Sequence, residues 1–251
     1  MKKLFCTSDV HSYFDELMIA LNQAGFDINN EEHIFVCCGD LLDRGGFPTK
    51  CIKFVNNLPD NRKILIRGNH EVLADDVIHR GYFGWHDWHN GTAETVQFLS
   101  EYPASPFSVP EAEVIESFAH NPDWVKYFNS TVYYKEVGDY IFTHGWIPCG
   151  GTKDYPVYEA NWREKSFNEA VWYNGMAMWN EGVRVPGKTV VCGHFHAAWG
   201  NQLLHDLDPE NTSMVEFNST FKDNGILALD SRVPATHFLN VEVLEVEDDI
   251  F

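Results

Sequence analysis

The side chains of this sequence that could do metal chemistry occur in small groups, each directly after an apolar run. Carboxylate, amide and imidazole groups of this kind bind divalent ions such as Mn, Fe, Zn or Co. Together they exceed what one ion requires, which indicates two metals that share a bridging carboxylate, an arrangement suited to in-line displacement at phosphorus. In chain order the groups are Asp9 with His11, Asp40 with Asp43, Asn69 with His70, His144, and His194 with His196.

Strands and helices that alternate along the chain must position these groups. The apolar runs are predicted to be strands and the amphipathic stretches after them helices, a rhythm typical of an α/β fold. In such folds the loops at the carboxyl ends of the strands hold the ligands. The strands are expected at residues 3–7, 33–38, 63–67, 131–136, 140–143, 188–192, 225–229 and 238–246, and the helices at 14–24, 49–57, from about Glu71, and at 167–179.

A helical pattern interrupted by prolines occupies the middle of the chain, roughly residues 81–128. It predicts several short helices that form a cap insertion over the sheet. Because no linker rich in Gly, Ser or Pro divides the chain, a single domain over residues 1–251 is the simplest expectation. Aromatic and histidine side chains in the cap predict either packing or a platform on which a nucleobase stacks. They are Tyr82, Phe83, Trp85, His86, Trp88 and His89.

The 251 residues carry 37 acidic and 18 basic groups, which gives a formal net charge of −19. This excess argues against a surface that neutralises nucleic-acid phosphates, so stable nucleic-acid binding is not expected. The apolar run at the amino terminus is too short for a signal peptide or a membrane span, which favours a cytoplasmic protein without membrane contact. The six cysteines show no CxxC spacing, and we expect them to be reduced core residues.

Five short motifs carry more specific information than any single residue: SDVH, GDLLDRG, IRGNHE, THG and CGHFH. The second is the most specific, because a glycine-rich turn alone does not predict two carboxylates and an arginine together. In this order the motifs resemble those of the calcineurin-like metallophosphoesterases, most closely the phosphoprotein (Ser/Thr) phosphatases and their bacterial and phage relatives. The resemblance runs from Lys3 to about Val246. It implies an α/β sandwich of two mixed β-sheets flanked by helices.

The resemblance also implies how the motif residues divide between two divalent ions. Mn is the expected metal, with Fe, Zn, Co or Ni as alternatives. Asp40 would bridge the pair. The first metal would be held by Asp9, His11 and His196, and the second by Asn69, His144 and His194.

Further roles for four residues follow from the same resemblance. His70 would be the general acid that protonates the leaving alkoxide, and Asp43 would hold its other ring nitrogen and so fix its tautomer. Arg44 would clamp two phosphate oxygens through its planar guanidinium, and Asn69 would also contact the substrate. The attacking group would be a water activated between the two metals, in line with the leaving oxygen.

The sequence departs from the protein-phosphatase pattern at a second phosphate-binding arginine. That arginine generally follows an aromatic residue shortly before the GH motif, whereas here Trp179 is followed by Asn180 and Glu181. Arg184 and Arg163 are the candidates to replace it. A carboxylate near that position would repel a dianionic phosphate monoester more than a monoanionic diester.

These observations lead to one main functional interpretation and two others. The main one is a metal-dependent hydrolase like the Ser/Thr protein phosphatases, with a phosphorylated protein as substrate. The alternative is a nucleotide phosphohydrolase, like a diadenosine tetraphosphatase, or a phosphodiesterase, acting on a nucleotide or another phosphorylated small molecule. The third is a metal-binding scaffold without catalysis, against which the presence of His70, Asp43 and Arg44 argues.

Overall fold

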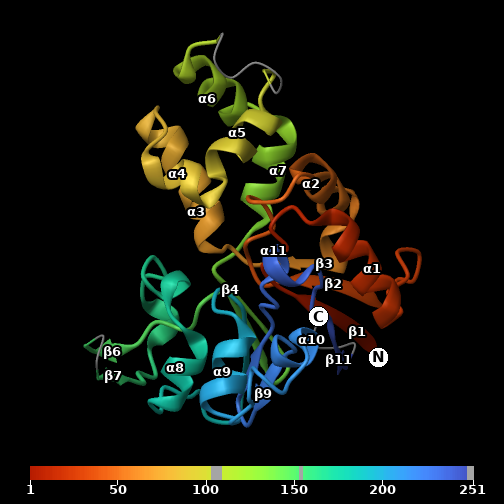
Figure 1. The fold of residues 1–251 in the computed structure, drawn as a ribbon, viewed down its shortest axis with the longest axis vertical. Coiled ribbons are helices and arrows are strands. Elements are labelled where there is room, and N and C mark those ends of the chain that lie inside the picture. The colour runs from red at the N-terminus through yellow and green to blue at the C-terminus, as the bar shows by residue number, and fades with distance from the viewer. Residues whose placement is uncertain (103–108, 153–154, 248–251) are drawn as a thin grey trace.

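The computed structural model describes residues 1–102, 109–152 and 155–247, and its first feature is a four-stranded mixed sheet (Figure 1). The strand order is β11-β1-β2-β3; β1, β2 and β3 run parallel, whereas β11 pairs antiparallel with β1. The strands are β1 (Lys2–Thr7), β2 (His33–Cys37), β3 (Lys63–Leu65) and β11 (Glu242–Val246).

A second mixed sheet has five strands in the order β4-β5-β8-β10-β9. The central strands β5, β8 and β10 are parallel, and antiparallel strands flank them on both sides. The strands are β4 (Tyr134–Val137), β5 (Tyr140–Thr143), β8 (Thr189–Cys192), β9 (Phe221–Asp223) and β10 (Ile226–Ala228). A short separate hairpin pairs β6 (Gly150–Gly151) with β7 (Pro156–Val157).

The two sheets pack against each other through a core built by the alternation of strand side chains. In β1, Leu4 and Cys6 lie between the sheets, together with Val36 of β2 and Val191 of β8. Phe5 points to the opposite face and packs with the helices instead. Because successive side chains of a strand point to opposite faces, a strand that is apolar throughout is buried on both sides. The predicted sandwich of two mixed sheets flanked by helices is thereby confirmed.

Helices cover the outer face of each sheet. The helices α1 (Phe14–Ala24) and α2 (Pro48–Asn57) bury their apolar sides against the first sheet. Against the second sheet lie α8 (Gly175–Asn180) and a cluster of tryptophans, Trp146, Trp162 and Trp179. The remaining helices of these two layers are α3 (Asn69–Arg80), α9 (Ala197–Leu203), α10 (Met214–Phe217) and α11 (Val233–Thr236).

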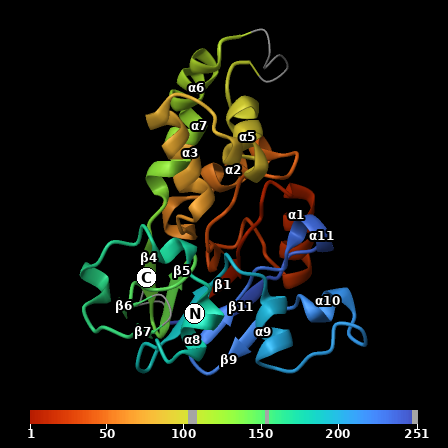
Figure 2. The same ribbon diagram turned by 60° about the vertical axis from the view of Figure 1, so that its left-hand side comes forward.

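Short helices occupy the predicted cap region, of which residues 103–108 lie outside the described part of the chain. They pack against α2 and α3 and extend away from the sheets, forming the upper part of the molecule in Figures 1 and 2. Their apolar side chains join the core on the outer face of the first sheet, for example Phe118 and Tyr127. The helices are α4 (Trp85–Asn90), α5 (Thr92–Leu99), α6 (Glu111–Ala119) and α7 (Pro122–Ser130).

Several predicted elements differ from those observed. The helix expected at residues 167–179 is wrong: a single 3₁₀ turn covers Ala170–Trp172, and α8 begins only at Gly175. The break lies at Asn174, whose side chain accepts a hydrogen bond from the Ala177 backbone N–H and starts a new helix. The strand expected from residue 238 begins at Glu242, and β9 was not predicted.

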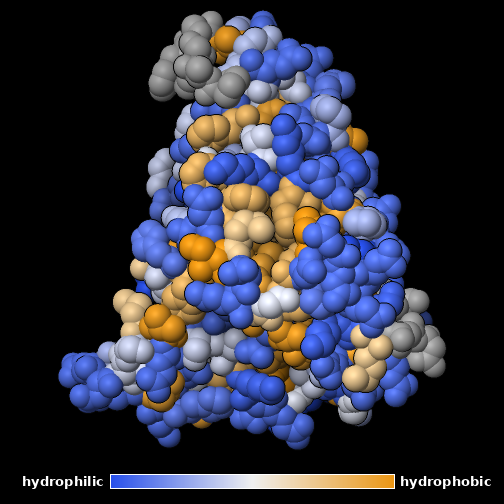
Figure 3. All heavy atoms as spheres, turned by 90° about the vertical axis from the view of Figure 1, so that its right-hand side faces the viewer, coloured by the Kyte–Doolittle hydropathy of each residue, from blue (hydrophilic) through white to orange (hydrophobic). Residues whose placement is uncertain are grey.

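The surface of the molecule and the state of its cysteines can be compared with what the composition predicts. In the described part of the chain no helix is long and apolar enough to cross a membrane. Figure 3 shows a mostly hydrophilic face with an apolar strip in its middle. All six cysteines are free, and five of them are buried, as expected for reduced core residues. The cytoplasmic location and the single domain stay predictions.

Candidate metal centre

The loops at the carboxyl ends of the parallel strands meet between the two sheets and the helical cap. Asp9 follows β1, Asp40 follows β2, His144 follows β5 and His194 follows β8. The side chains enclose a cavity of about 290 Å³. The residues that line it are Asp9, His11, Asp40, Arg44, Asn69, His70, His194, Phe195, His196 and Asp230. Except for Phe195 and Asp230, all were predicted site residues.

Three histidines are held in one tautomer by a hydrogen bond from Nδ1. That atom of His11 donates to the Leu42 carbonyl over 3.1 Å, and that of His144 donates to the Cys38 carbonyl over 2.7 Å. In His196, Nδ1 donates to the Asp230 carboxylate over 2.8 Å. When the ring is neutral, an Nδ1–H held in this way leaves Nε2 as the lone-pair donor, which is the usual arrangement of a metal-binding imidazole.

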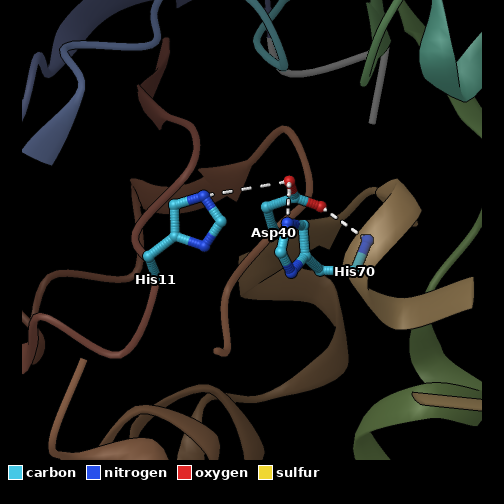
Figure 4. A group of neighbouring side chains, drawn as sticks. All are labelled: His11, Asp40 and His70. Atoms are coloured by element: carbon cyan, nitrogen blue, oxygen red, sulfur yellow. Dashed lines mark hydrogen bonds and ion pairs between the residues drawn. The ribbon is translucent and has the colours of Figure 1, made fainter. Parts of the chain in front are cut away.

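Asp40 lies at the centre of this arrangement. Its Oδ2 atom is 3.3 Å from Nε2 of His144, 3.9 Å from Nε2 of His70 and 4.0 Å from Nε2 of His11. Figure 4 shows the His11 and His70 rings facing this carboxylate from two sides. Its other oxygen, Oδ1, accepts the backbone N–H of His70 over 3.0 Å. A buried carboxylate with imidazoles around it is a suitable bridging ligand.

Two groups of donor atoms therefore share Asp40. In one, Asp40 joins His11 and His70; in the other, it joins His144 and His194. The donor atoms within each group lie within 4.8 Å of one another. Nε2 of His144 is also 2.9 Å from Oδ1 of Asn69. This donor chemistry fits two divalent ions with a shared carboxylate, although the grouping by distance places His70 beside the ligands.

Burial and neighbouring charge set opposite pKa shifts across the centre. Burial, helped by nearby positive groups, lowers the pKa of His11 to about 3 and that of His194 to about 4. Burial alone would also lower the pKa of His144, but the Asp40 and Asp9 carboxylates outweigh it and raise that pKa to about 10. His144, His70 and His11 keep the pKa of Asp40 well below its usual range against the effect of burial. The neutral imidazoles of His11 and His194 and the ionised carboxylate of Asp40 are therefore in the form that binds cations.

His70 and Asp43 form a buried pair beside this centre. Nδ1 of His70 donates to Oδ2 of Asp43 over 2.6 Å, and the Thr92 hydroxyl donates to the same oxygen over 2.6 Å. Nη2 of Arg44 lies 3.2 Å from Nε2 of His70. The pKa of His70 is raised, because Asp40 and Asp43 outweigh the effect of burial. Nε2 of His70, the ring nitrogen on the side of the cavity, therefore lies next to the exposed guanidinium of Arg44.

The loops that carry these residues adopt strained backbone conformations. Asp9, His11, Asp40, Asp43 and His194 all have positive φ, between 49° and 75°. Such conformations are costly for residues other than glycine and persist where the surrounding structure fixes them, often at functional sites. At Gly39 the backbone also lies very close to a site residue, because a Cβ on Gly39 would be 2.5 Å from Nδ1 of His144.

Asp230 belongs to the site and was missed by sequence reasoning. It follows β10, is 2% exposed and lines the cavity. Its carboxylate accepts from Nδ1 of His196 and thereby directs Nε2 of that ring. The pKa of Asp230 is lowered, because the hydrogen bond and the charge of His196, together with the hydrogen bond from the Arg232 backbone N–H, outweigh the effect of burial. No spacing pattern marks this aspartate, although its position after an apolar run matches that of the other groups.

Glu71 holds two site loops together. Its carboxylate accepts the backbone N–H groups of Asp40, Leu41 and Gly68 at 3.0, 3.0 and 2.7 Å. The hydroxyl of Tyr127, from α7 of the cap, donates to it over 2.7 Å. The loops after β2 and β3 are therefore fixed to each other and to the cap.

The two candidates for a second phosphate-binding arginine are engaged away from the cavity. Arg163 pairs with Glu136, and Arg184 donates to the Trp179 carbonyl over 3.0 Å with its guanidinium above the Trp179 ring. Neither lines the cavity, and neither does Glu181. The cap aromatics divide between two surroundings. Phe83 packs against the core on the outer face of the first sheet, whereas Trp85 is 79% exposed and stacks on His89 at 5.1 Å.

Sequence comparison places most of the chain in one family. A model described as calcineurin-like phosphoesterase matches residues 2–226. A symmetrical bis(5'-nucleosyl)-tetraphosphatase from Buchnera aphidicola is 39% identical over 64 residues, which are 26% of this chain and 22% of that protein. A protein of the same description from Psychromonas ingrahamii is 38% identical over 79 residues, or 31% and 26% of the two chains. The chain thus matches only about a quarter of the length of these curated relatives.

Comparison with solved structures supports the fold. A crystal structure assigned provisionally as a diadenosine tetraphosphatase superposes with a TM-score of 0.56 and 13% identity, covering 96% of this chain and 88% of the other. At identities this low the similarity concerns the fold alone. With the family model covering most of its length, the chain belongs to the calcineurin-like phosphoesterases, a family of metal-dependent hydrolases, and the resemblance predicted from its motifs is confirmed at that level.

Proposed function

We propose that this chain is a metal-dependent nucleotide phosphohydrolase that cleaves dinucleoside polyphosphates. The observation that carries the proposal is the pair of donor groups sharing Asp40, with His70 and Arg44 at the same cavity. The tetraphosphatase relatives favour a nucleotide substrate, and so move this alternative ahead of the Ser/Thr protein phosphatase interpretation.

An aromatic rim beside the centre supports a substrate that carries a base. Phe195 lines the cavity and is 38% exposed. Trp172 is 45% exposed and meets the ring of His194 edge-on, with centroids 5.9 Å apart. Exposed aromatic rings are suitable stacking surfaces for nucleobases, each worth about 1–3 kcal/mol in nucleic-acid complexes. A phosphoserine or phosphothreonine offers no such group.

The metals would be held by Asp40 between them, by Asp9, His11 and His196 on one side and by Asn69, His144 and His194 on the other. When bound, two divalent ions would neutralise charge on the phosphoryl oxygens and make a water acidic enough to attack phosphorus at neutral pH. Mn²⁺ stays a prediction from the donor chemistry.

The chain's own residues would supply positioning and proton transfer. The guanidinium of Arg44, exposed at the cavity, would donate to two oxygens of the reacting phosphate and orient it for in-line attack. The amide of Asn69 would assist by donating to a phosphate oxygen. As the bond from phosphorus to the leaving oxygen breaks, His70 would give that oxygen a proton from Nε2, while Asp43 keeps the proton on Nδ1.

A substrate panel tests the proposal. The Mn²⁺-loaded protein is assayed against diadenosine tetraphosphate, a phosphothreonine peptide and bis(p-nitrophenyl) phosphate. We expect kcat/KM for the dinucleotide to exceed that for the peptide by at least about 100-fold, the scale of two good stacking or ionic contacts. Faster turnover of the peptide would restore the protein phosphatase interpretation.

A pair of variants at the rim shows whether the base is recognised. Trp172→Leu and Phe195→Leu should raise KM for the dinucleotide by roughly 5-fold or more, the lower end of the stacking range. Neither should change kcat/KM for bis(p-nitrophenyl) phosphate by more than about twofold. Tyr155→Leu, which is 78% exposed and does not line the cavity, is the matched control for the loss of a surface aromatic ring.

A further inference from the structure

The carboxylate that holds His70 is itself held by a residue of the cap. The hydroxyl of Thr92, the first residue of α5, donates to Oδ2 of Asp43 over 2.6 Å. The same oxygen accepts Nδ1–H of His70 over 2.6 Å. Because all three residues are buried, water competes little for these two hydrogen bonds. The helix α5, yellow in Figures 1 and 2, therefore reaches the proposed acid through one shared carboxylate oxygen.

A second threonine of α5 supports the backbone of the same aspartate. Oγ1 of Thr95 accepts the Asp43 backbone N–H over 3.1 Å. Asp43 has a φ of +75° and Arg44 a φ of +63°, conformations that are costly for residues with side chains and need support from their surroundings. Residues three apart lie on the same face of a helix, so Thr92 and Thr95 hold the side chain and the backbone of Asp43 from one face of α5.

The helix and the loop after β2 are packed too closely for either to move alone. A Cβ on Gly91, the residue before α5, would collide with the backbone nitrogen of Arg44. At its other side α5 is fixed by Val96 and Leu99, which are buried in the core on the outer face of the first sheet. The helix contacts α3 there, whose second residue is His70. The acid and the helix that holds its partner thus belong to one packed body.

Two donors on one carboxylate oxygen restrict the rotation of that carboxylate about its Cβ–Cγ bond. Without the Thr92 hydroxyl, only the ring of His70 would orient Oδ2 of Asp43, and ring and carboxylate could turn together. The direction in which Nε2 gives a proton to the leaving oxygen depends on the orientation of the ring, and small misplacements of a reacting group are costly.

We propose that Thr92 is a positioning residue for proton transfer, whose hydroxyl fixes the Asp43 carboxylate and, through it, the ring of His70. The inference rests on the proposed function for the role of His70 as the acid. Thr92 does not line the cavity, so it acts through Asp43 and not on the substrate. The cap thereby takes part in the reaction through one hydroxyl group.

The test compares variants that differ in this hydroxyl, in the Mn²⁺-loaded protein. Thr92→Val keeps the volume and branching of the buried side chain but donates no hydrogen bond, whereas Thr92→Ser keeps the donor. We expect Thr92→Val to lower kcat for an alkyl phosphate ester about tenfold, the lower end of the range for a lost partner behind a metal-site residue. The kcat for a p-nitrophenyl ester, whose leaving group needs no proton, should change by less than about twofold. Thr92→Ser should stay within about threefold of the parent for both esters.

A second readout needs neither metal nor turnover. In the metal-free protein the Nδ1 proton of His70, held by Asp43, should give a downfield ¹H NMR signal that is missing from His70→Ala. The signal should persist in Thr92→Ser and broaden in Thr92→Val, because a proton on a mobile carboxylate partner exchanges faster with water. Ser100→Ala is the matched control at the other end of α5, where that hydroxyl donates to the Gln97 carbonyl over 2.8 Å. It should change neither the signal nor the dependence on the leaving group.

Three results would overturn the assignment: a Thr92→Val variant with the parent's kcat for the alkyl ester, an equal loss for both esters, or an unchanged NMR signal. Thermal unfolding verifies the fold of each variant. If Thr92→Val does not fold, Thr92→Ala makes the same comparison with a smaller side chain. Neither ester contains a nucleoside and the NMR signal needs no substrate. Failure to hydrolyse diadenosine tetraphosphate would therefore reject the proposed function without deciding this test.

Discussion

At the scale of single residues, His70 is close to the donor groups, so its role as an acid has to be separated from metal binding. The acid matters most when the leaving group is a poor one, because p-nitrophenolate departs without a proton whereas an alkoxide does not. We expect His70→Ala to lower kcat for an alkyl phosphate ester by about 10²–10⁴-fold, the range of general acid catalysis, and kcat for a p-nitrophenyl ester by less than about tenfold.

Metal content by elemental analysis should stay at the parent value in this variant. Asp43→Asn is the matched partner: it leaves the ring of His70 in place but removes the charged acceptor of Nδ1. It should reproduce the dependence on the leaving group with a smaller loss. An equal loss for both kinds of ester would instead indicate that His70 binds metal or holds the fold.

The spacing of the motifs was enough to predict most of the residues that line the cavity. Each motif follows a parallel strand, and the carboxyl ends of parallel strands meet. Asp230 was not predicted, because no spacing pattern in the sequence marks it. Its place in the site depends on β10 pairing with β8, and nothing local to the short strand reveals that partner. The orientation of Arg163 and Arg184 was equally hidden, since proximity in sequence to a motif does not say which face of an element a side chain occupies.

At the scale of elements, Glu71 is the connection between the loop after β2, the loop after β3 and the cap. All four of its described partners are donors, and its carboxylate is 1% exposed. Glu71→Gln places an amide donor against other donors in a buried site. We expect a loss of about 2–3 kcal/mol in the free energy of unfolding, measured in urea, because buried polar groups are left unsatisfied.

Tyr127→Phe is the control for this variant. It removes one donor and leaves three backbone N–H groups on the carboxylate, so the loss should be only about 1 kcal/mol. If the two variants were equally stable, the carboxylate would not be the link between the loops.

The helix predicted at residues 167–179 was also wrong at the scale of elements, because the capping side chain of Asn174 outweighed the helical pattern around it.

At the scale of the whole molecule, the metal-free protein compensates for its buried carboxylates with a proton on His144. Its pKa, raised by Asp40 and Asp9 against burial to about 10, exceeds the ordinary value of 6.5. The ion pair with Asp40 therefore stabilises the metal-free fold fully below about pH 6.5, and this contribution is lost as pH rises toward 10. A cation that binds at Nε2 of His144 must displace that proton.

Metal binding should consequently release about one proton from His144 at pH 7, and apparent affinity should rise with pH, because metal ligands bind in their deprotonated form. Calorimetric titration of Mn²⁺ in buffers of different ionisation enthalpy measures this number directly. His120→Ala, which removes an exposed histidine of the cap, should release the same number of protons as the parent, whereas His144→Ala should release fewer and bind more weakly. A heat of binding that does not vary with the buffer would show that His144 is already neutral before the metal binds, and would contradict the proton assigned to it in the metal-free protein.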